Sequence, residues 1–370
     1  MASVKDARRI AFIITGLGMG GAENQVVNLC DQFALKGHSV LLISLSGPVV
    51  VKPKRSDVKV VSMGMLKSPI SAVGAYVRAR RLLQEFKPNI VHSHMVHANL
   101  FARALRISVW FDQLICTAHS SNEGGRLRMA LYRLTDWIAD LTTNVSHDGV
   151  ARFIKIGAVP AKKIKMVPNG IDCDRFRNLS TRRSEMRAAL NSKDEDFVFL
   201  AVGRFVPEKD YFNLLRSFHI VQGHNPSVEL WIAGSGAEME ACKKLASELD
   251  IAERIKFLGV RYDIPEVMSA SDAFVLSSKI EGLPLVVGEA MACERPVVVT
   301  DAGGVRELVD DIGSIVPVED SAQLAVAMMK AASLTSSDRQ ESGRQARAYV
   351  EKNYSLAAVV SQWSKIYGTA

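Results

Sequence analysis

Short apolar runs rich in β-branched residues alternate with longer segments of helical period over the first 170 residues of the chain. Runs of this kind are typical of strands that are buried on both faces. We predict strands at Ile10–Thr15, Val40–Leu45, Val58–Ser62, Ile90–His94, Leu114–Ala118, Leu141–Val145 and Ile164–Val167. The helices expected between them are Ala22–Leu35, Ser71–Phe86, Ala98–Val109, Gly125–Ala139 and Asp148–Lys155. This alternation favours a parallel sheet with helices on both faces.

The same alternation restarts after a polar linker and a short helix between Asp172 and Asp196. Further strands are predicted at Phe197–Val202, Val228–Ala233, Ile255–Leu258, Ala273–Ser277 and Val297–Thr300. Only helical segments follow residue 320, namely Ala322–Leu334, Asp338–Lys352 and Leu356–Tyr367. We therefore predict an α/β protein of two doubly wound domains, 1–172 and 173–350. We expect the segment 351–370 to form a helix that packs on the second domain or crosses back to the first.

Composition narrows the class of protein. The chain has 370 residues, of which 48% are hydrophobic and 23% charged, and this excludes a disordered or collagen-like chain. No apolar run approaches the roughly 20 residues of a membrane-spanning helix, and the first residues lack the layout of a signal peptide. We therefore expect a cytoplasmic protein. The five cysteines show no CxxC spacing, so neither a disulfide framework nor a zinc site is indicated.

Charge is distributed unevenly along the chain. The first 180 residues hold 25 Lys and Arg against 12 Asp and Glu, and the remainder holds 21 against 27. This asymmetry suggests an anionic partner such as a membrane surface, a phosphorylated acceptor or a nucleic acid. No nucleic-acid recognition motif accompanies the charge. Helices that combine arginine with apolar and aromatic residues favour an anionic membrane surface, and a solvated helix face remains the alternative. The expected basic face contains Arg78, Arg81, Arg126, Arg128 and Arg133.

A glycine-rich loop, Gly16–Gly21, separates the first predicted strand from the first helix. Its GxGxxG spacing would let backbone N–H groups approach an anion at the start of the helix. A dinucleotide-binding fold also needs an acidic residue near the end of the second strand, and that strand ends without one. The loop is thus either a tight turn or a contact for a phosphate or an acceptor, without NAD.

Two basic residues follow the first strand of the second predicted domain. Arg204 and Lys209 come directly after this strand, at the edge where doubly wound sheets bind ligands. A guanidinium and an ammonium group together can neutralise a diphosphate leaving group without a metal. On their own, without a further motif, the two residues are better explained as solvated surface charges.

A third motif, from Lys279 to Cys293, favours the diphosphate-binding interpretation of Arg204 and Lys209 over surface charges. Glu281 lies in a loop after a strand, and Pro284 suits the first turn of the following helix. The free N–H groups of that helix start can bind a phosphate, while Glu281 and Glu289 can accept hydrogen bonds from sugar and ribose hydroxyls. The combination points to a sugar nucleotide.

At this point the chain resembles the family 4 retaining glycosyltransferases of GT-B fold, in which two Rossmann-like domains face a central cleft. The likeness covers nearly the whole chain and is closest to bacterial enzymes that extend O-antigen, capsule or related lipid-linked oligosaccharides. It is carried by Glu281-x7-Glu289 with Gly282, Gly203-Arg204, Lys209, Pro168-Asn-Gly-Ile-Asp172, Gly20-Gly21-Ala22-Glu23, His92-Ser-His94 and Thr117-Ala-His119.

The resemblance implies roles for individual residues. Glu281 would contact the donor sugar, Glu289 the ribose, and His119 the reacting sugar. Further donor contacts would come from Gly20, Gly21, Arg204, Lys209, Gly234, Arg261, Gly282, Leu283 and Leu285. It also implies retention of the anomeric configuration and no metal cofactor. Without the resemblance, His119 fits a strand-end histidine equally well.

Several other motifs remain open. His92, His94 and His97 suggest a metal cluster on paper, but no further ligand lies nearby in sequence, so acceptor contacts or strand-end packing are favoured. Asn169 completes the expected acceptor side. Two DxD motifs begin at Asp172 and Asp194, and both lie in the linker region, where surface or capping roles are favoured over metal binding.

These observations favour a sugar transferase that moves a hexose or N-acetylhexosamine from a nucleotide sugar onto a lipid-linked or polysaccharide glycan. A UDP-sugar is the favoured donor and GDP-mannose the second. We expect the protein at the inner face of the cytoplasmic membrane. Two alternatives remain, a non-hydrolysing sugar-nucleotide epimerase of the same architecture and a non-catalytic peripheral membrane protein.

Overall fold

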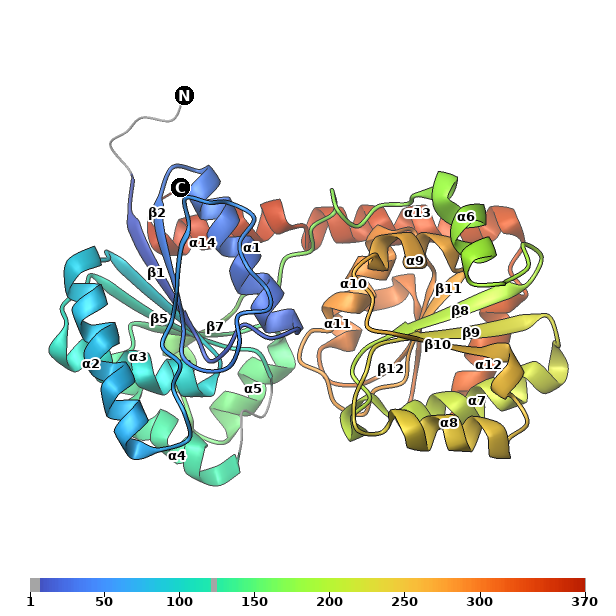
Figure 1. Ribbon diagram of the computed structural model, residues 1–370, viewed down its shortest axis with the longest axis horizontal. Helices are drawn as coiled ribbons and strands as arrows, with labels where there is room; N and C mark the ends of the chain where they lie inside the picture. Colours follow the sequence, from blue (N-terminus) through green and yellow to red (C-terminus); the bar gives the residue numbers. More distant parts are fainter. Residues whose placement is uncertain (1–6, 121–124, 370) are drawn as a thin grey trace. The chain divides into compact units, whose positions relative to one another are not determined.

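The computed structural model describes residues 7–120 and 125–369, and it divides into two compact units. The first unit runs to Gly170 and also contains the segment from Leu356 onward, while the second spans Ile171–Ser355 (Figure 1). Among the described residues, no helix is long and apolar enough to cross a membrane.

A seven-stranded parallel sheet forms the centre of the first unit. Its strands follow the order β3-β2-β1-β4-β5-β6-β7. They are β1 (Arg9–Ile14), β2 (Ser39–Ser44), β3 (Lys59–Ser62), β4 (Ile90–His94), β5 (Gln113–Ala118), β6 (Leu141–Asn144) and β7 (Ile164–Met166). The order reverses between β1 and β4, so the loops after these strands diverge at the edge where such sheets bind ligands.

Alternate residues of this sheet pack against helices on opposite faces. Ile10, Phe12 and Ile14 face α1 (Gly21–Leu35) and the last helix, α14 (Leu356–Tyr367). Ala11 and Ile13 face α2 and α3 on the other side. These and the neighbouring helices are α2 (Pro69–Phe86), α3 (Val96–Ser108), α4 (Gly125–Thr135) and α5 (His147–Lys155). The two-residue period of the strands thus builds two apolar layers from one sheet.

The second unit contains a six-stranded parallel sheet in the order β10-β9-β8-β11-β12-β13. Its strands are β8 (Phe197–Val202), β9 (Val228–Ala233), β10 (Ile255–Gly259), β11 (Ala273–Leu276), β12 (Val297–Thr300) and β13 (Ser314–Val316). Its helices are α6 (Arg183–Ala189), α7 (Tyr211–His224), α8 (Met239–Glu248), α9 (Ile264–Ala270), α10 (Leu285–Ala292), α11 (Val305–Val309), α12 (Ser321–Ala332) and α13 (Ser336–Asn353). Helices α7, α8 and α12 cover one face, while α6, α9, α10 and α13 lie on the other (Figure 1).

The predicted fold class, two parallel α/β domains, is confirmed. Two elements differ from expectation. The edge strand β13 has only three residues and gave no apolar run to detect. The helix expected over Gly125–Ala139 ends at Thr135 and continues as a 3₁₀ turn over Asp136–Ile138. There the Asp136 carboxylate lies 3.8 Å from both Arg103 and Lys163, which fixes the turn against the sheet.

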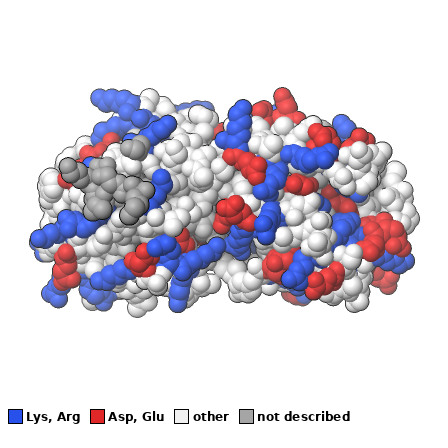
Figure 2. Space-filling view, turned by 90° about the horizontal axis from the view of Figure 1, so that it is seen from above, with Lys and Arg blue, Asp and Glu red and all other residues white. Residues whose placement is uncertain are grey.

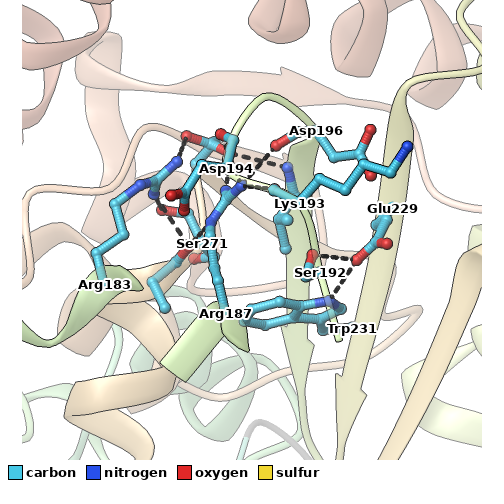
Figure 3. A network of polar contacts seen from close by, with 12 residues as sticks. Arg183, Arg187, Ser192, Lys193, Asp194, Asp196, Glu229, Trp231 and Ser271 are labelled. Atoms are coloured by element: carbon cyan, nitrogen blue, oxygen red, sulfur yellow. Dashed lines mark hydrogen bonds and ion pairs between the residues drawn. The ribbon is translucent and has the colours of Figure 1, made fainter. Parts of the chain in front are cut away.

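A buried polar network anchors α6 to the second sheet (Figure 3). The guanidinium of Arg187 is fully enclosed and donates to Asp272 at 2.6 Å and to the carbonyl of Asp196 at 2.8 Å. Arg183 donates to the other oxygen of Asp272 at 2.8 Å. The Asp196 carboxylate is buried and pairs with Arg254 at 3.2 Å. Asp196 therefore has a structural role just before β8 begins.

Candidate active site

The loops after β8 and β11 carry the charged residues expected at the donor site. Strand order reverses between these two strands, so their carboxyl ends define the switch point of the second sheet. The loops are joined by backbone, because the N–H of Lys279 donates to the carbonyl of Glu208 at 2.8 Å. The hydroxyl of Ser277 donates to the carbonyl of Lys209 at 2.9 Å. Residues more than 60 positions apart are thus held together at this edge.

Lys209 and Glu281 form an ion pair at this position. The ammonium of Lys209 lies 2.5 Å from Oε1 of Glu281, and both side chains are mostly shielded from solvent. The fully buried hydroxyl of Ser278 donates to the same oxygen at 2.6 Å. Ser278 is itself fixed, since Thr300 donates to its carbonyl at 2.6 Å. Two donors on Oε1 leave Oε2 of Glu281 to accept hydroxyl groups from a ligand.

Ser278 was not among the residues expected from the sequence. The signal that could have identified it is its position three residues before Glu281, at the end of a buried strand. In a tight loop, this spacing lets a hydroxyl reach a following carboxylate.

Two glycine loops come into close contact beside this pair. A Cβ atom on Gly234, at φ +144°, would lie 1.8 Å from the carbonyl oxygen of Gly203. A Cβ on Gly203 would in turn lie 3.0 Å from the hydroxyl of Tyr211 and 3.4 Å from Lys209. Only glycine permits this approach at position 234. The loop after β9 therefore packs directly against the loop that carries Arg204 and Lys209.

Helix α10 begins beside Glu281, at Leu285, with Pro284 as its N-cap. The helix thus starts one residue later than expected for Pro284 in its first turn. No side chain caps its first N–H groups, so they remain suited to an anion. The backbone from Gly282 to Leu285 leads directly into this helix start, and Leu283 and Leu285 are buried.

Glu289 lies one turn into α10 and is partly buried. Burial raises its pKa from 4.5 to about 7; Arg175 opposes this shift and Asp172 adds to it. No hydrogen bond to its carboxyl group is found among the described residues. A carboxyl group held in this way can exchange its proton near neutral pH and hydrogen-bond a hydroxyl in either state.

Arg204 and Arg261 differ in how they are held. Arg204 is exposed and forms no ion pair with another described residue. Arg261 follows β10 and donates through Nε to Asp263 at 2.8 Å, and its terminal nitrogen also contacts Asp263. Arg204 is therefore the more available of the two guanidinium groups for a phosphate.

Histidines form a second cluster within the first unit. His119 follows β5, and its Nε2 lies 3.0 Å from Nδ1 of His94 at the end of β4. Burial lowers the pKa of His119 to about 4 and holds that of His94 well below its usual range. His119 is therefore neutral at physiological pH, and its ring can form hydrogen bonds without carrying a positive charge.

His92 and His94 lie deeper than expected for acceptor contacts. Both are buried, and His92 bonds Tyr367 through Nδ1 and Thr117 through Nε2, each at 2.6 Å. Its ring also packs 4.4 Å from that of Trp363. His92 therefore joins α14 to the sheet and belongs to the core. All five residues of β4 are buried, so this strand is enclosed on both of its faces.

The remaining expected residues of the first unit surround the start of α1 and α3. Gly20 is the N-cap of α1, and a Cβ there would meet the carboxylate of Glu23 at 2.4 Å. Asn169 is buried beside Gly170, whose N–H donates to Gln25 of α1 at 2.9 Å. His97 is exposed on α3, where partial burial and then the positive charge of Arg128 lower its pKa.

The other open motifs also have defined surroundings. Asp172 caps a turn by accepting from the backbone N–H of Arg175 at 3.1 Å. Within residues 7–120 and 125–369, no group of three or more His, Cys, Asp or Glu side chains is arranged to hold a metal ion. The side chain of Arg126 lies outside the described part, while Arg78, Arg81, Arg128 and Arg133 are exposed.

Both units match models of known protein families. Residues 19–175 match the model described as Glycosyltransferase Family 4, and residues 182–349 match the one described as Glycosyl transferases group 1. Together the two matches cover most of both units. The chain belongs to the family 4 glycosyltransferases, which have the GT-B fold.

Individual relatives come mainly from bacteria. The chain is 28% identical over 253 residues to the UDP-Gal:alpha-D-GlcNAc-diphosphoundecaprenol alpha-1,3-galactosyltransferase of Escherichia coli. That match covers 66% of this chain and 64% of the relative, so it spans less than two thirds of that enzyme. It is also 30% identical over 212 residues to a GDP-mannose-dependent phosphatidylinositol monomannoside mannosyltransferase of Mycolicibacterium smegmatis, with 54% of this chain and 55% of the relative covered.

Solved structures share the fold. HepE of Anabaena, determined in complex with UDP and glucose, superposes with a TM-score of 0.84 at 19% identity, covering 98% of this chain and all of that chain. A glycosyltransferase of Rickettsia africae gives a TM-score of 0.87 at 18% identity, with 98% of each chain covered.

Proposed function

We propose that the chain transfers a hexose or N-acetylhexosamine from a nucleotide sugar to a lipid-linked or polysaccharide glycan, with retention of configuration and without a metal. A UDP-sugar is the favoured donor and GDP-mannose the second. The relatives include one named for UDP-Gal and one named as GDP-mannose-dependent.

One observation carries the proposal: the pairing of Lys209 with Glu281 beside the uncapped start of α10. A donor diphosphate placed at this helix start meets free N–H groups and the positive charges of Lys209 and Arg204. The second oxygen of Glu281 then accepts from a sugar hydroxyl. As the glycosidic bond breaks, these donors stabilise the charge that develops on the departing phosphate.

We assign the remaining site residues around this centre. Glu289 would accept from the ribose, and Gly234 would let the backbone approach the nucleotide. Arg261 would lie near the base, and His119 near the reacting sugar. Gly20 and Gly21 would contact the phosphates. On the acceptor side we retain His97 and Asn169, whereas His92 has a structural role.

Nucleotide binding gives the first test. Thermal unfolding is followed with UDP, GDP, ADP and NAD, each with and without EDTA, because a ligand that binds only the native state raises its stability. Selective stabilisation by UDP or GDP that EDTA does not change supports the proposal and identifies the donor class. Stabilisation by NAD alone, or loss of nucleotide binding with EDTA, contradicts it.

Removal of the central carboxylate gives the second test. Glu281→Ala should reduce transfer at least a hundredfold with little change in melting temperature. The matched control is Glu253→Ala, an exposed carboxylate of the same unit. Full activity of Glu281→Ala would contradict the site assignment.

We further propose that the first unit binds an anionic membrane surface. Leu127, Leu131 and Leu134 form one exposed stripe along α4, and Trp137 beyond the helix is 75% exposed. Exposed Arg128 and Arg133 flank this stripe. Apolar side chains flanked by arginines suit the interface of a bilayer with negative headgroups.

This surface is tested by sedimentation with phosphatidylglycerol vesicles, with phosphatidylcholine vesicles as the neutral comparison. Leu134→Glu should abolish sedimentation with the anionic vesicles. The control Val326→Glu, at an exposed apolar residue of the second unit, should not. Equal sedimentation of native protein with both lipids would contradict the electrostatic part of the proposal, and unchanged sedimentation of Leu134→Glu would contradict the apolar part.

A further inference from the structure

A groove in the first unit, at the edge where the strands of its sheet begin, has no part in the proposed reaction. It lies beside the end of α2 and the segments that lead into β4 and β5, and it encloses about 390 Å³. Sites that bind small ligands typically enclose about 300–1,000 Å³. Leu83, Pro88 and Val109 form its buried apolar floor. The rim carries Arg9, Gln84, Lys87, Asn89, Trp110 and Asp112.

The rim is held in place by hydrogen bonds between the segments that precede three strands. Arg9 begins β1, and its backbone N–H donates to Oδ1 of Asn89 at 3.0 Å. The backbone N–H of Asn89 donates to the carbonyl of Arg9 at 2.8 Å. The side-chain amide of Asn89 donates to Oδ2 of Asp112 at 3.2 Å. The groove is therefore fixed by the protein's own contacts, so binding there requires little rearrangement.

The aromatic ring of Trp110 is open to solvent at this rim. Its side chain is 83% exposed, whereas Trp231 and Trp363 are buried. Within residues 7–120 and 125–369, no hydrogen bond or ion pair is found for the side chains of Trp110, Gln84 or Lys87. An aromatic face and several polar groups thus remain available to a ligand in one groove.

The ends of two helices influence the charge of the groove. Lys87 is the C-cap of α2, and Val109 is the C-cap of α3. The last carbonyl groups of a helix lack partners within it and carry partial negative charge, so they favour hydroxyl groups over phosphates. Together with the carboxylate of Asp112, they offset the positive charges of Arg9 and Lys87. The groove is therefore suited to an uncharged ligand that is rich in hydroxyl groups.

A sugar combines these features. The C–H groups on one face of a sugar ring pack against an aromatic ring, while its hydroxyls bond with carboxylate, amide and carbonyl groups. Trp110 supplies the aromatic face, and Gln84 and Asp112 supply the polar groups. We propose that this groove binds a neutral oligosaccharide of hexose or N-acetylhexosamine units.

The groove is remote from the residues assigned to the acceptor side. β1 has six residues, so the groove lies about 20 Å from the opposite edge of the sheet, where the loops after the strands gather. The groove therefore holds a distal part of a glycan rather than its reacting end. This role in transfer rests on the proposed function, whereas oligosaccharide binding by the groove does not.

Tryptophan fluorescence of the full chain gives the first test. Trp137→Phe leaves Trp110 as the exposed tryptophan, because Trp231 and Trp363 are at most 2% exposed. Maltohexaose or chitohexaose should shift its emission to shorter wavelength as the ring leaves water. The chain that carries Trp110→Phe as well gives the background from the buried rings. No shift with either oligosaccharide overturns the proposal, as does an equal or larger shift with UDP or with phosphatidylglycerol vesicles.

Calorimetric titration with the same two oligosaccharides locates the binding. Trp110→Ala should weaken it at least about tenfold. The matched control is Trp137→Ala, an exposed tryptophan outside the groove, which should leave the affinity unchanged. Both variants should keep the native melting temperature, because both side chains are exposed. Unchanged affinity of Trp110→Ala overturns the proposal.

Transfer assays examine the role of the groove. With the nucleotide sugar that proves to be the donor, Trp110→Ala should lower kcat/KM for a hexasaccharide acceptor about tenfold and leave that for a monosaccharide acceptor unchanged. Equal losses with both acceptors would contradict the holding of a distal segment. Should native protein transfer no sugar, the proposed function fails, while the two titrations still decide whether the groove binds an oligosaccharide.

Discussion

Glu289 shows how a single buried carboxyl group makes stability depend on pH. Burial raises its pKa to about 7 in the folded protein, whereas 4.5 is the ordinary value. Between these values the folded state binds more protons than the unfolded state, so the free energy of unfolding falls as pH rises. The loss of stability caused by ionising the buried carboxyl group is complete above pH 7 and absent below about pH 4.5.

Replacement of this group should remove this loss of stability. Glu289→Gln is expected to raise the free energy of unfolding by about 2 kcal/mol at pH 8, and the gain should disappear toward pH 4.5. Urea unfolding across this pH range measures the difference. The control Glu253→Gln should change stability by less than about 0.5 kcal/mol at every pH. A gain that is the same at both ends of the range would contradict the raised pKa.

Gly234 gives a second test at the residue scale. Any Cβ at this position would overlap the carbonyl of Gly203, and the backbone is in a conformation that favours glycine. We expect Gly234→Ala to lower the free energy of unfolding by at least about 2 kcal/mol and to weaken nucleotide binding. Gly223→Ala, in open space on α7, should instead stabilise by about 0.5–1 kcal/mol. Urea unfolding of both variants tests the sign of each effect.

At the scale of elements, the carboxylate of Asp272 connects several elements at one end of the second sheet. Its carboxylate accepts from Arg183, from Arg187 and from the backbone N–H of Val198 at 2.9 Å. It thereby fixes α6, the start of β11 and the start of β8 with one buried group. Breaking a buried ion pair leaves an uncompensated charge, which is more costly than losing an exposed pair.

Arg187→Ala should therefore lower the free energy of unfolding by about 3 kcal/mol. The neighbouring Arg182→Ala breaks only an exposed pair with Glu185 and should cost less than about 0.5 kcal/mol. Chemical denaturation measures both. Similar losses in the two variants would show that burial does not set the contribution of the network.

The same scale explains what could be predicted from the sequence. Buried strands were predictable because apolar runs between polar turns have few other interpretations. The pairing of Lys209 with Glu281 was not, since it joins loops 72 residues apart and depends on strand order. For His92, the sequence left acceptor contacts and strand-end packing open, because its partner Tyr367 lies 275 residues away in sequence. Local sequence patterns are enough to predict helices and strands. Contacts between segments that are far apart in sequence can be predicted only when the fold is known.

At the scale of the whole molecule, the net charge of each half of the sequence says little about where a charged partner would bind. Figure 2 shows Lys and Arg interspersed with Asp and Glu over the face in view, rather than gathered in one patch. Part of the basic excess is also internal, since Arg103 is fully buried beneath α4 and donates to the carbonyl of Tyr132 at 2.8 Å. Net charge counts such residues, although they cannot meet a partner.

The last helix, α14, packs in the core of the first unit although it follows the second unit in sequence. Trp363 is 2% exposed and packs against His92 and Tyr367. Trp363→Ala should lower the free energy of unfolding by about 3–5 kcal/mol. Hydrogen exchange should accelerate in β1 and β4 more than in β8 and β11. Equal acceleration in all four strands would show that the two units unfold as one.

The place of α14 also bears on how the protein is made. The strands of the first sheet have all been synthesised by Met166. One face of this sheet is not fully covered until α14 (Leu356–Tyr367) has left the ribosome. The second unit, with roughly 185 residues, is synthesised in between. Synthesis proceeds at about 5–20 residues per second, so Phe12, Phe33 and His92 lack their contacts with α14 for about 10–40 s. During that interval the first half exposes apolar surface of the kind that favours aggregation, even though its synthesis began first.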